Sequence, residues 1–168
     1  MITSIILIIS IALDGILTNY LPYLVNDLSY FTPLLTVVSI FIIYPLNRKK
    51  ENKFFIIIFI VGIIYDLLYT NLLFLNGLLF LLIALVSKII YKNFETSYLK
   101  LIIYTILIIV IYETAYASIL FIYRVVPITL YKLIYKITHT ILLNIIYVEL
   151  LNYIIKCLPK KYKKISIN

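Results

Sequence analysis

The stretch DLLYTNLL, residues Asp66 to Leu73, closes a long apolar run and places an acid, a hydroxyl and an amide within it. The same pattern, Asp-x-x-x-Thr-Asn-x-Leu, occurs earlier in DGILTNYL, residues Asp14 to Leu21. An acid in the middle of a membrane helix costs about 2.5–3.5 kcal/mol on insertion scales. Neither acid is therefore expected to face lipid.

The composition around the two motifs is that of an integral membrane protein. Of the 168 residues, 64% are hydrophobic, whereas soluble domains are about half apolar. Several runs approach or exceed the roughly 18 apolar residues that indicate a membrane span. The net charge of +8 would suggest nucleic acid binding in a soluble domain. Here the bases lie between the apolar runs, so we expect membrane lipid as the surroundings and no nucleic acid partner.

The apolar runs and the turn signals between them predict an all-α fold, a bundle of six transmembrane helices in one domain covering residues 1–168. The expected helices cover about residues 2–20, 31–46, 54–70, 72–91, 98–123 and 128–158. The second of them should begin within FTPLL, with Thr32 as its cap and Pro33 at the first helical position.

The bases are divided unevenly between the two ends of this predicted bundle. Twelve of the 15 lysines and arginines lie after the second helix, around the end of the fourth, or in the C-terminal segment. Basic segments of membrane proteins stay in the cytoplasm. We therefore expect a multi-pass membrane protein with both termini in the cytoplasm.

A third acid, Glu113, is followed by TAYASIL and forms a weaker copy of the motif. About thirteen residues precede each acid in its own helix, which corresponds to roughly 20 Å of helix. Asp14, Asp66 and Glu113 are thus expected at one depth, toward the outer leaflet. Because charge is costly in lipid, they should face the bundle interior, a cavity or a partner.

Polar residues near the three acids are their candidate partners. Threonines follow the two aspartates by one helical turn, and a lysine, lysine, histidine series recurs on one face of the last helix and should meet at least one acid. The candidate set is Asp14, Thr18, Asn19, Asp66, Thr70, Asn71, Asn76, Glu113, Lys132, Lys136 and His139. It could form a structural polar lock between helices or a contact site for a partner, and the sequence leaves both open.

The sequence contains no recognisable catalytic or metal-binding pattern. His139 is the only histidine and has no cysteine near it, so we expect neither a metal site nor a cofactor. No Ser-His-Asp set, glycine-rich phosphate loop or pair of acids at catalytic spacing stands out. We therefore expect a protein without enzymatic activity.

Three segments resemble the family of the bacterial rod shape-determining protein MreD. They are LDGILTNYLP (13–22), FTPLLTVVSIFIIYP (31–45) and GIIYDLLYTNLLFLNGLLFLLIALV (62–86). The helix layout is similar over the whole chain, and the motifs are similar over residues 13–86. The chain departs from the family at Phe74, where glycine often precedes the Leu-Asn pair.

The resemblance implies a scaffold in the bacterial cytoplasmic (inner) membrane, part of the cell-elongation (rod) complex, that supports side-wall peptidoglycan synthesis and cell-shape control. Its implied partner is MreC, with MreB, RodA and a class B penicillin-binding protein reached indirectly. The family is also similar to the substrate-binding membrane subunits of energy-coupling-factor vitamin transporters, which are six-helix bundles. The alternative is therefore a transport subunit whose polar residues surround a ligand pocket open to the outside.

Overall fold

The computed structural model describes residues 2–20, 32–70, 72–93, 97–123 and 130–157. The elements in these ranges are α1 (Ile2–Tyr20), α3 (Leu35–Asn47), the 3-10 turn η1 (Arg48–Lys50), α4 (Glu51–Tyr69), α5 (Leu75–Asn93), α6 (Tyr98–Ile122) and α7 (Leu130–Cys157). Every element described is helical, which confirms the prediction of an all-α chain.

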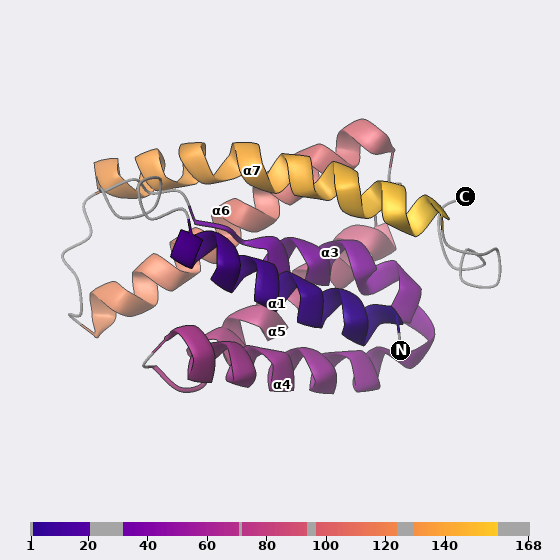
Figure 1. The fold of residues 1–168 in the computed structure, drawn as a ribbon, viewed down its shortest axis with the longest axis horizontal. Helices are drawn as coiled ribbons and strands as arrows, with labels where there is room; N and C mark the ends of the chain where they lie inside the picture. The colour runs from indigo at the N-terminus through magenta and orange to yellow at the C-terminus, as the bar shows by residue number, and fades with distance from the viewer. Residues whose placement is uncertain (1, 21–31, 71, 94–96, 124–129, 158–168) are drawn as a thin grey trace.

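Consecutive helices run in opposite directions along the bundle (Figure 1). At one end α1, α4 and α6 finish and α3, α5 and α7 begin. We call this the acid end, because Asp14, Asp66 and Glu113 lie toward it. The opposite, basic end is where α1 begins and α7 finishes. It carries Arg48, Lys49, Lys50, Lys88, Lys92 and Lys156.

Five helical stretches are long and apolar enough to cross a membrane: Ile2–Asn19, Leu35–Tyr69, Leu75–Asn93, Tyr98–Ile122 and Leu130–Cys157. The second stretch joins α3, η1 and α4, although α3 and α4 run in opposite directions on either side of η1 (Figure 1). With 13 residues, α3 is about 20 Å long. It is therefore short for a hydrocarbon core of about 30 Å.

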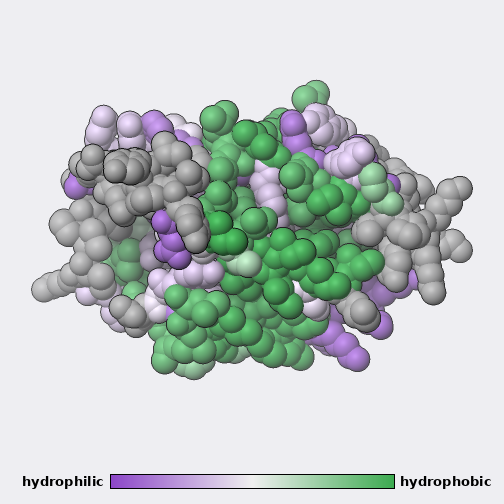
Figure 2. All heavy atoms as spheres, viewed as in Figure 1, coloured by the Kyte–Doolittle hydropathy of each residue, from purple (hydrophilic) through white to green (hydrophobic). Residues whose placement is uncertain are grey.

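The surface of the bundle is apolar in the middle and hydrophilic toward both ends on the face shown in Figure 2. Large side chains such as Leu67, Leu142 and Ile146 are 68%, 70% and 61% exposed. Soluble monomers rarely expose contiguous apolar patches of this kind, and a lipid environment accounts for them. The helices are thus those of a multi-pass membrane protein.

The short helix α3 is the centre of the bundle. All residues from Leu35 to Tyr44 are buried, and α3 contacts α1, α4, α5, α6 and α7. Such a helix is apolar all round because it has no solvent or lipid face. Its two polar residues in this stretch, Thr36 and Ser39, are fully buried and hydrogen-bonded to other helices.

The predicted start of this helix is wrong. The helix begins at Leu35, with Leu34 in the N-cap position and no side-chain cap of its own. Thr32 and Pro33 lie before the helix instead of capping and opening it. The N–H groups at this helix start are bound by side chains of α1 and α7, so a cap from the adjacent sequence is not required.

Helices α4 and α5 form a tight hairpin in which two glycines meet. A Cβ atom added to Gly62 would lie 2.5 Å from the Cα of Gly77 and 2.7 Å from the carbonyl oxygen of Asn76. The turn before α5 contains Phe74, which has a φ of 69°. This left-handed conformation favours glycine, and glycine is the residue that the MreD resemblance leads one to expect there.

Candidate functional site

Asp14 of α1 caps the start of α3. Its Oδ1 accepts the N–H of Leu35 at 2.9 Å, and its Oδ2 accepts the N–H of Thr36 at 3.0 Å and the Thr36 hydroxyl at 2.6 Å. The first N–H groups of a helix have no partner within the helix, and a negative charge is favourable at this positive end of the helix dipole. Asp14 is only 2% exposed, and the start of α3 is its partner.

Asp66 of α4 caps the start of α5 in the same way. Oδ2 accepts the N–H of Asn76 at 2.9 Å, and Oδ1 accepts the Asn76 side-chain amide at 2.7 Å. The hydroxyl of Thr70 donates to Oδ1 at 2.7 Å, so the threonine of the motif secures the cap. In the first copy, Thr18 instead donates to the backbone carbonyl of Asp14 at 2.7 Å.

The two copies of the sequence motif therefore have one structural role. In each, an acid near the end of one helix binds the first N–H groups of the next described helix. This arrangement closes α1 onto α3 and α4 onto α5, and it compensates the cost of two buried carboxylates with charge-assisted hydrogen bonds.

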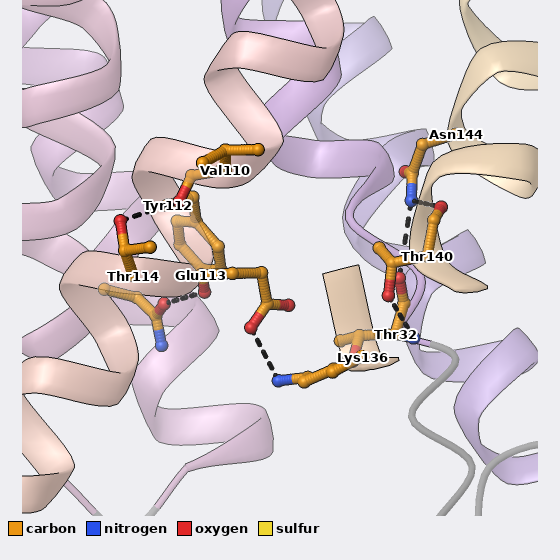
Figure 3. Close-up of polar contacts among 9 residues, drawn as sticks. Thr32, Val110, Tyr112, Glu113, Thr114, Lys136, Thr140 and Asn144 are labelled. Carbon is orange, nitrogen blue, oxygen red and sulfur yellow. Dashed lines mark hydrogen bonds and ion pairs between the residues drawn. The ribbon is translucent and has the colours of Figure 1, made fainter. Parts of the chain in front are cut away.

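Helix α7 supplies further acceptors for the start of α3. The side-chain oxygen Oδ1 of Asn144 accepts the N–H of Leu34 at 3.1 Å, and the Thr140 hydroxyl accepts the N–H of Thr32 at 3.2 Å. Figure 3 shows both side chains pointing toward Thr32 from one face of α7. Together with Asp14, they provide partners for the N–H groups of Thr32, Leu34, Leu35 and Thr36.

Glu113 of α6 departs from the pattern of the two aspartates. Its Oε2 forms an ion pair with Nζ of Lys136 on α7 at 2.8 Å, which is the expected contact between an acid and the basic face of the last helix (Figure 3). The Glu113 side chain is 1% exposed, whereas that of Lys136 is 26% exposed. Oε1 of Glu113 is buried and has no hydrogen-bond partner among the described residues.

A cavity of about 420 Å³ lies among these groups at the acid end. Seven of the sequence-derived candidates line it: Asp14, Thr18, Asn19, Thr70, Asn76, Glu113 and Lys136. Four tyrosines complete much of its wall: Tyr65, Tyr69, Tyr112 and Tyr116. One of them, Tyr112, donates its hydroxyl to Oδ1 of Asn76 at 2.6 Å, which links α6 to the cap at α5.

The remaining candidates lie apart from this cavity or cannot be placed. His139 is exposed and stacks on Tyr135, with ring centroids 3.9 Å apart, and Lys132 is exposed on the same helix. Asp66 lies behind the lining residue Asn76, whose side-chain amide donates to it. Asn71 lies outside the described residues.

Several polar residues of the interior were not predicted. Ser10, Ser39 and Tyr147 bring α1, α3 and α7 together, with hydroxyl oxygens 2.6 to 3.1 Å apart. Thr140 and Asn144 were missed as well, although they continue the face of Lys136 at intervals of four residues. That regular spacing is the sequence signal that could have revealed them.

The basic end has its own polar cluster. Glu51 pairs with Lys88 at 2.7 Å and accepts the hydroxyl of Tyr44 at 2.6 Å, while the Arg48 guanidinium donates to the backbone carbonyl of Tyr91. These bonds tie η1 and α4 to α5 at the point where α3 turns back. Unlike the acid end, this cluster is substantially exposed.

Comparison with known proteins assigns no identity to the chain. No family model matches the sequence, and no curated protein and no solved structure shows significant similarity to it. In the described residues, no group of three His, Cys, Asp or Glu side chains is placed to hold a metal ion.

Proposed function

We propose that this chain is a non-enzymatic scaffold of the MreD type, which binds MreC in the rod complex and supports side-wall peptidoglycan synthesis and cell-shape control. MreB, RodA and a class B penicillin-binding protein would be reached through that complex. The proposal places all six helices across the bacterial cytoplasmic membrane, with the basic end and both termini in the cytoplasm, in accordance with the distribution of bases.

The observation that supports this proposal is the use of Asp14 and Asp66 as caps between helices. Both lie in the segments that resemble the MreD family, and each carboxylate is occupied by backbone and side-chain donors of the next helix. Groups occupied in this way hold the outer ends of the hairpins in one shape. A fixed outer surface suits a docking platform, because little conformational entropy is lost when a partner binds to it.

The test is copurification with the MreC of the same genome. Asp66→Leu should still insert into the membrane but lose most of its copurified MreC, because the uncapped start of α5 loosens the acid end. Asp66→Asn keeps one carbonyl acceptor and should retain an intermediate amount. Glu51→Gln at the basic end is the matched control and should behave like wild type. If wild type fails to bind MreC, or if Asp66→Leu binds it fully, the proposal is wrong.

The cavity favours a second candidate, a substrate-binding membrane subunit of an energy-coupling-factor transporter. Ligand pockets typically measure about 300–1,000 Å³, and the acid-end cavity of about 420 Å³ falls in that range. This candidate predicts copurification with a pair of ATPases and no retention of MreC. The same pull-down therefore separates the two candidates.

A further inference from the structure

We propose that the acid-end cavity binds the primary ammonium group of a small amine or of a lipid headgroup, with the Glu113 carboxylate as its acceptor. This inference goes beyond the scaffold role, and it does not depend on MreC. It rests on one buried carboxylate oxygen, on the charges around it and on the aromatic wall beside it.

Only one of the two carboxylate oxygens of Glu113 has a partner among the described residues. Oε2 holds the Lys136 ammonium at 2.8 Å, but Oε1 has no partner among the described residues although it is buried. In Figure 3, Oε1 points away from the contact between Oε2 and Nζ of Lys136, toward the side on which Thr32 lies. Thr32 and Glu113 both line the cavity. A buried polar atom without a partner costs about 1–3 kcal/mol, and more when it carries charge, so a donor delivered through the cavity would be stabilised there.

The charges of the cavity wall favour a cation. Two acids, Asp14 and Glu113, line the cavity together with Lys136, the single basic residue among the described lining residues. Asp14 is occupied by the start of α3, so Glu113 is the acid left to receive a ligand. With both acids ionised, these three side chains carry a net charge of −1, so the lining attracts an ammonium and repels an anion.

The aromatic wall suits the same chemistry. The rings of Tyr112 and Tyr116 are stacked with centroids 6.0 Å apart, and Nζ of Lys136 lies 5.5 Å from the centroid of Tyr116. Aromatic faces attract cations within about 6 Å of the ring centroid. The protein's own lysine therefore shows that an ammonium is accommodated between this carboxylate and the Tyr116 ring.

The size of the cavity sets the class of ligand. About 420 Å³ is far more than the roughly 30 Å³ that one water occupies in the liquid, and it can hold an ethanolamine-sized group. A free primary amine and phosphatidylethanolamine share this group. A primary ammonium carries N–H donors for Oε1, whereas the quaternary ammonium of choline has none.

Binding is tested on the purified full-length protein in detergent, without MreC. Ethanolamine and phosphatidylethanolamine are the probes, and choline and phosphatidylcholine are their respective controls. The affinity for each probe is taken from the shift in the protein's thermal midpoint with probe concentration. Native mass spectrometry counts the lipid molecules retained by the protein. We expect a primary-amine probe to bind at least tenfold more tightly than its choline counterpart. A response to ethanolamine indicates a soluble amine, and a response to phosphatidylethanolamine alone indicates a lipid headgroup.

Variants locate the effect. Glu113→Gln should weaken binding about tenfold, because a neutral acceptor replaces a charged one. Tyr116→Leu removes the aromatic face without changing the ion pair and should also weaken it. Glu149→Gln is the matched control. Glu149 is not among the described residues that line the cavity, and it accepts a hydrogen bond of 2.7 Å from the Tyr98 hydroxyl.

The proposal is overturned if no primary amine binds, which would mean that water is the only hydrogen-bond donor to Oε1. It is also overturned if amine and choline probes bind equally, or if both cavity variants bind like wild type. Failure of MreC to copurify would leave these measurements unaffected, so the two proposals can fail separately.

Discussion

The Asp14 carboxylate accepts the hydroxyl of Thr36 at 2.6 Å and the N–H of Thr36 at 3.0 Å. One residue of α1 thereby binds both the side chain and the backbone of the helix at the centre of the bundle. The relationship between Asp66 and Asn76 is of the same kind, since Asn76 also donates through its backbone and its side chain. Two prominent polar positions of an apolar chain are therefore helix caps delivered from neighbouring helices.

The cap of α3 can be tested by comparing Asp14→Ala with Thr36→Val. Asp14→Ala leaves the N–H groups of Leu35 and Thr36 buried without acceptors and should lower the free energy of unfolding by about 3 kcal/mol. Thr36→Val removes one hydroxyl and should cost about 1.5 kcal/mol. Unfolding in mixed micelles measures both. Equal losses would show that the backbone bonds to Asp14 contribute little.

The contact between α4 and α5 predicts different responses from two glycines. Gly62→Ala forces a methyl group against the Gly77 backbone at 2.5 Å and should lower stability by about 2–3 kcal/mol. A Cβ at Gly77 meets the Phe59 ring at 3.2 Å, and a side chain can shift, so Gly77→Ala should cost less than about 1 kcal/mol. The thermal midpoints of the two variants should therefore differ clearly, with Gly62→Ala lower.

The left-handed conformation of Phe74 predicts an unusual preference for glycine over alanine. Both variants lose the stack on Phe59, whose ring centroid lies 6.4 Å away. Only Phe74→Gly relieves the roughly 1–2 kcal/mol cost of φ 69°, so it should be more stable than Phe74→Ala by about 1 kcal/mol. Leu73, which has no positive φ, is the control, and there alanine should be the more stable. The reverse order at Phe74 would contradict the turn geometry.

The two ion pairs should differ in importance because one is buried. Lys136→Met leaves the Glu113 carboxylate uncompensated and should cost about 3 kcal/mol, and the double variant Glu113→Leu/Lys136→Met should recover most of that loss. Lys88→Met breaks a pair whose side chains are 40% and 29% exposed and should cost less than about 1 kcal/mol. Chemical unfolding of all three variants measures these differences. No recovery in the double variant would mean that Lys136 acts through other contacts.

The helices and the burial of the acids could be predicted because both follow from local composition. The predicted helix over 2–20 coincides with α1, and most other helix ends agree within about three residues. The shared location of Asp14, Asp66 and Glu113 toward one end followed from counting residues along helices of constant rise. Burial of these acids followed from the cost of exposing charge to lipid.

Thr70, Asn76 and Lys136 were among the candidate partners and do bind Asp66 and Glu113. The partners of Asp14 could not be predicted, because capping rules look only a few residues along the chain. Asp14 reaches Thr36, which is 22 residues away, and Asn144 reaches Leu34 across 110 residues. The expected cap at Thr32 was wrong for this reason. Of the three acids, Glu113 pairs with the basic face of the last helix, whereas the two aspartates accept backbone N–H groups of α3 and α5.

The dependence of α3 on Asn144 has a consequence for biosynthesis. During synthesis α7 is made after α3, and 110 residues separate Leu34 from Asn144, the acceptor of its N–H. In lipid, an unmatched backbone group costs several kcal/mol. A chain that stops before Leu130 would therefore leave the N–H of Leu34, at the start of α3, without this acceptor.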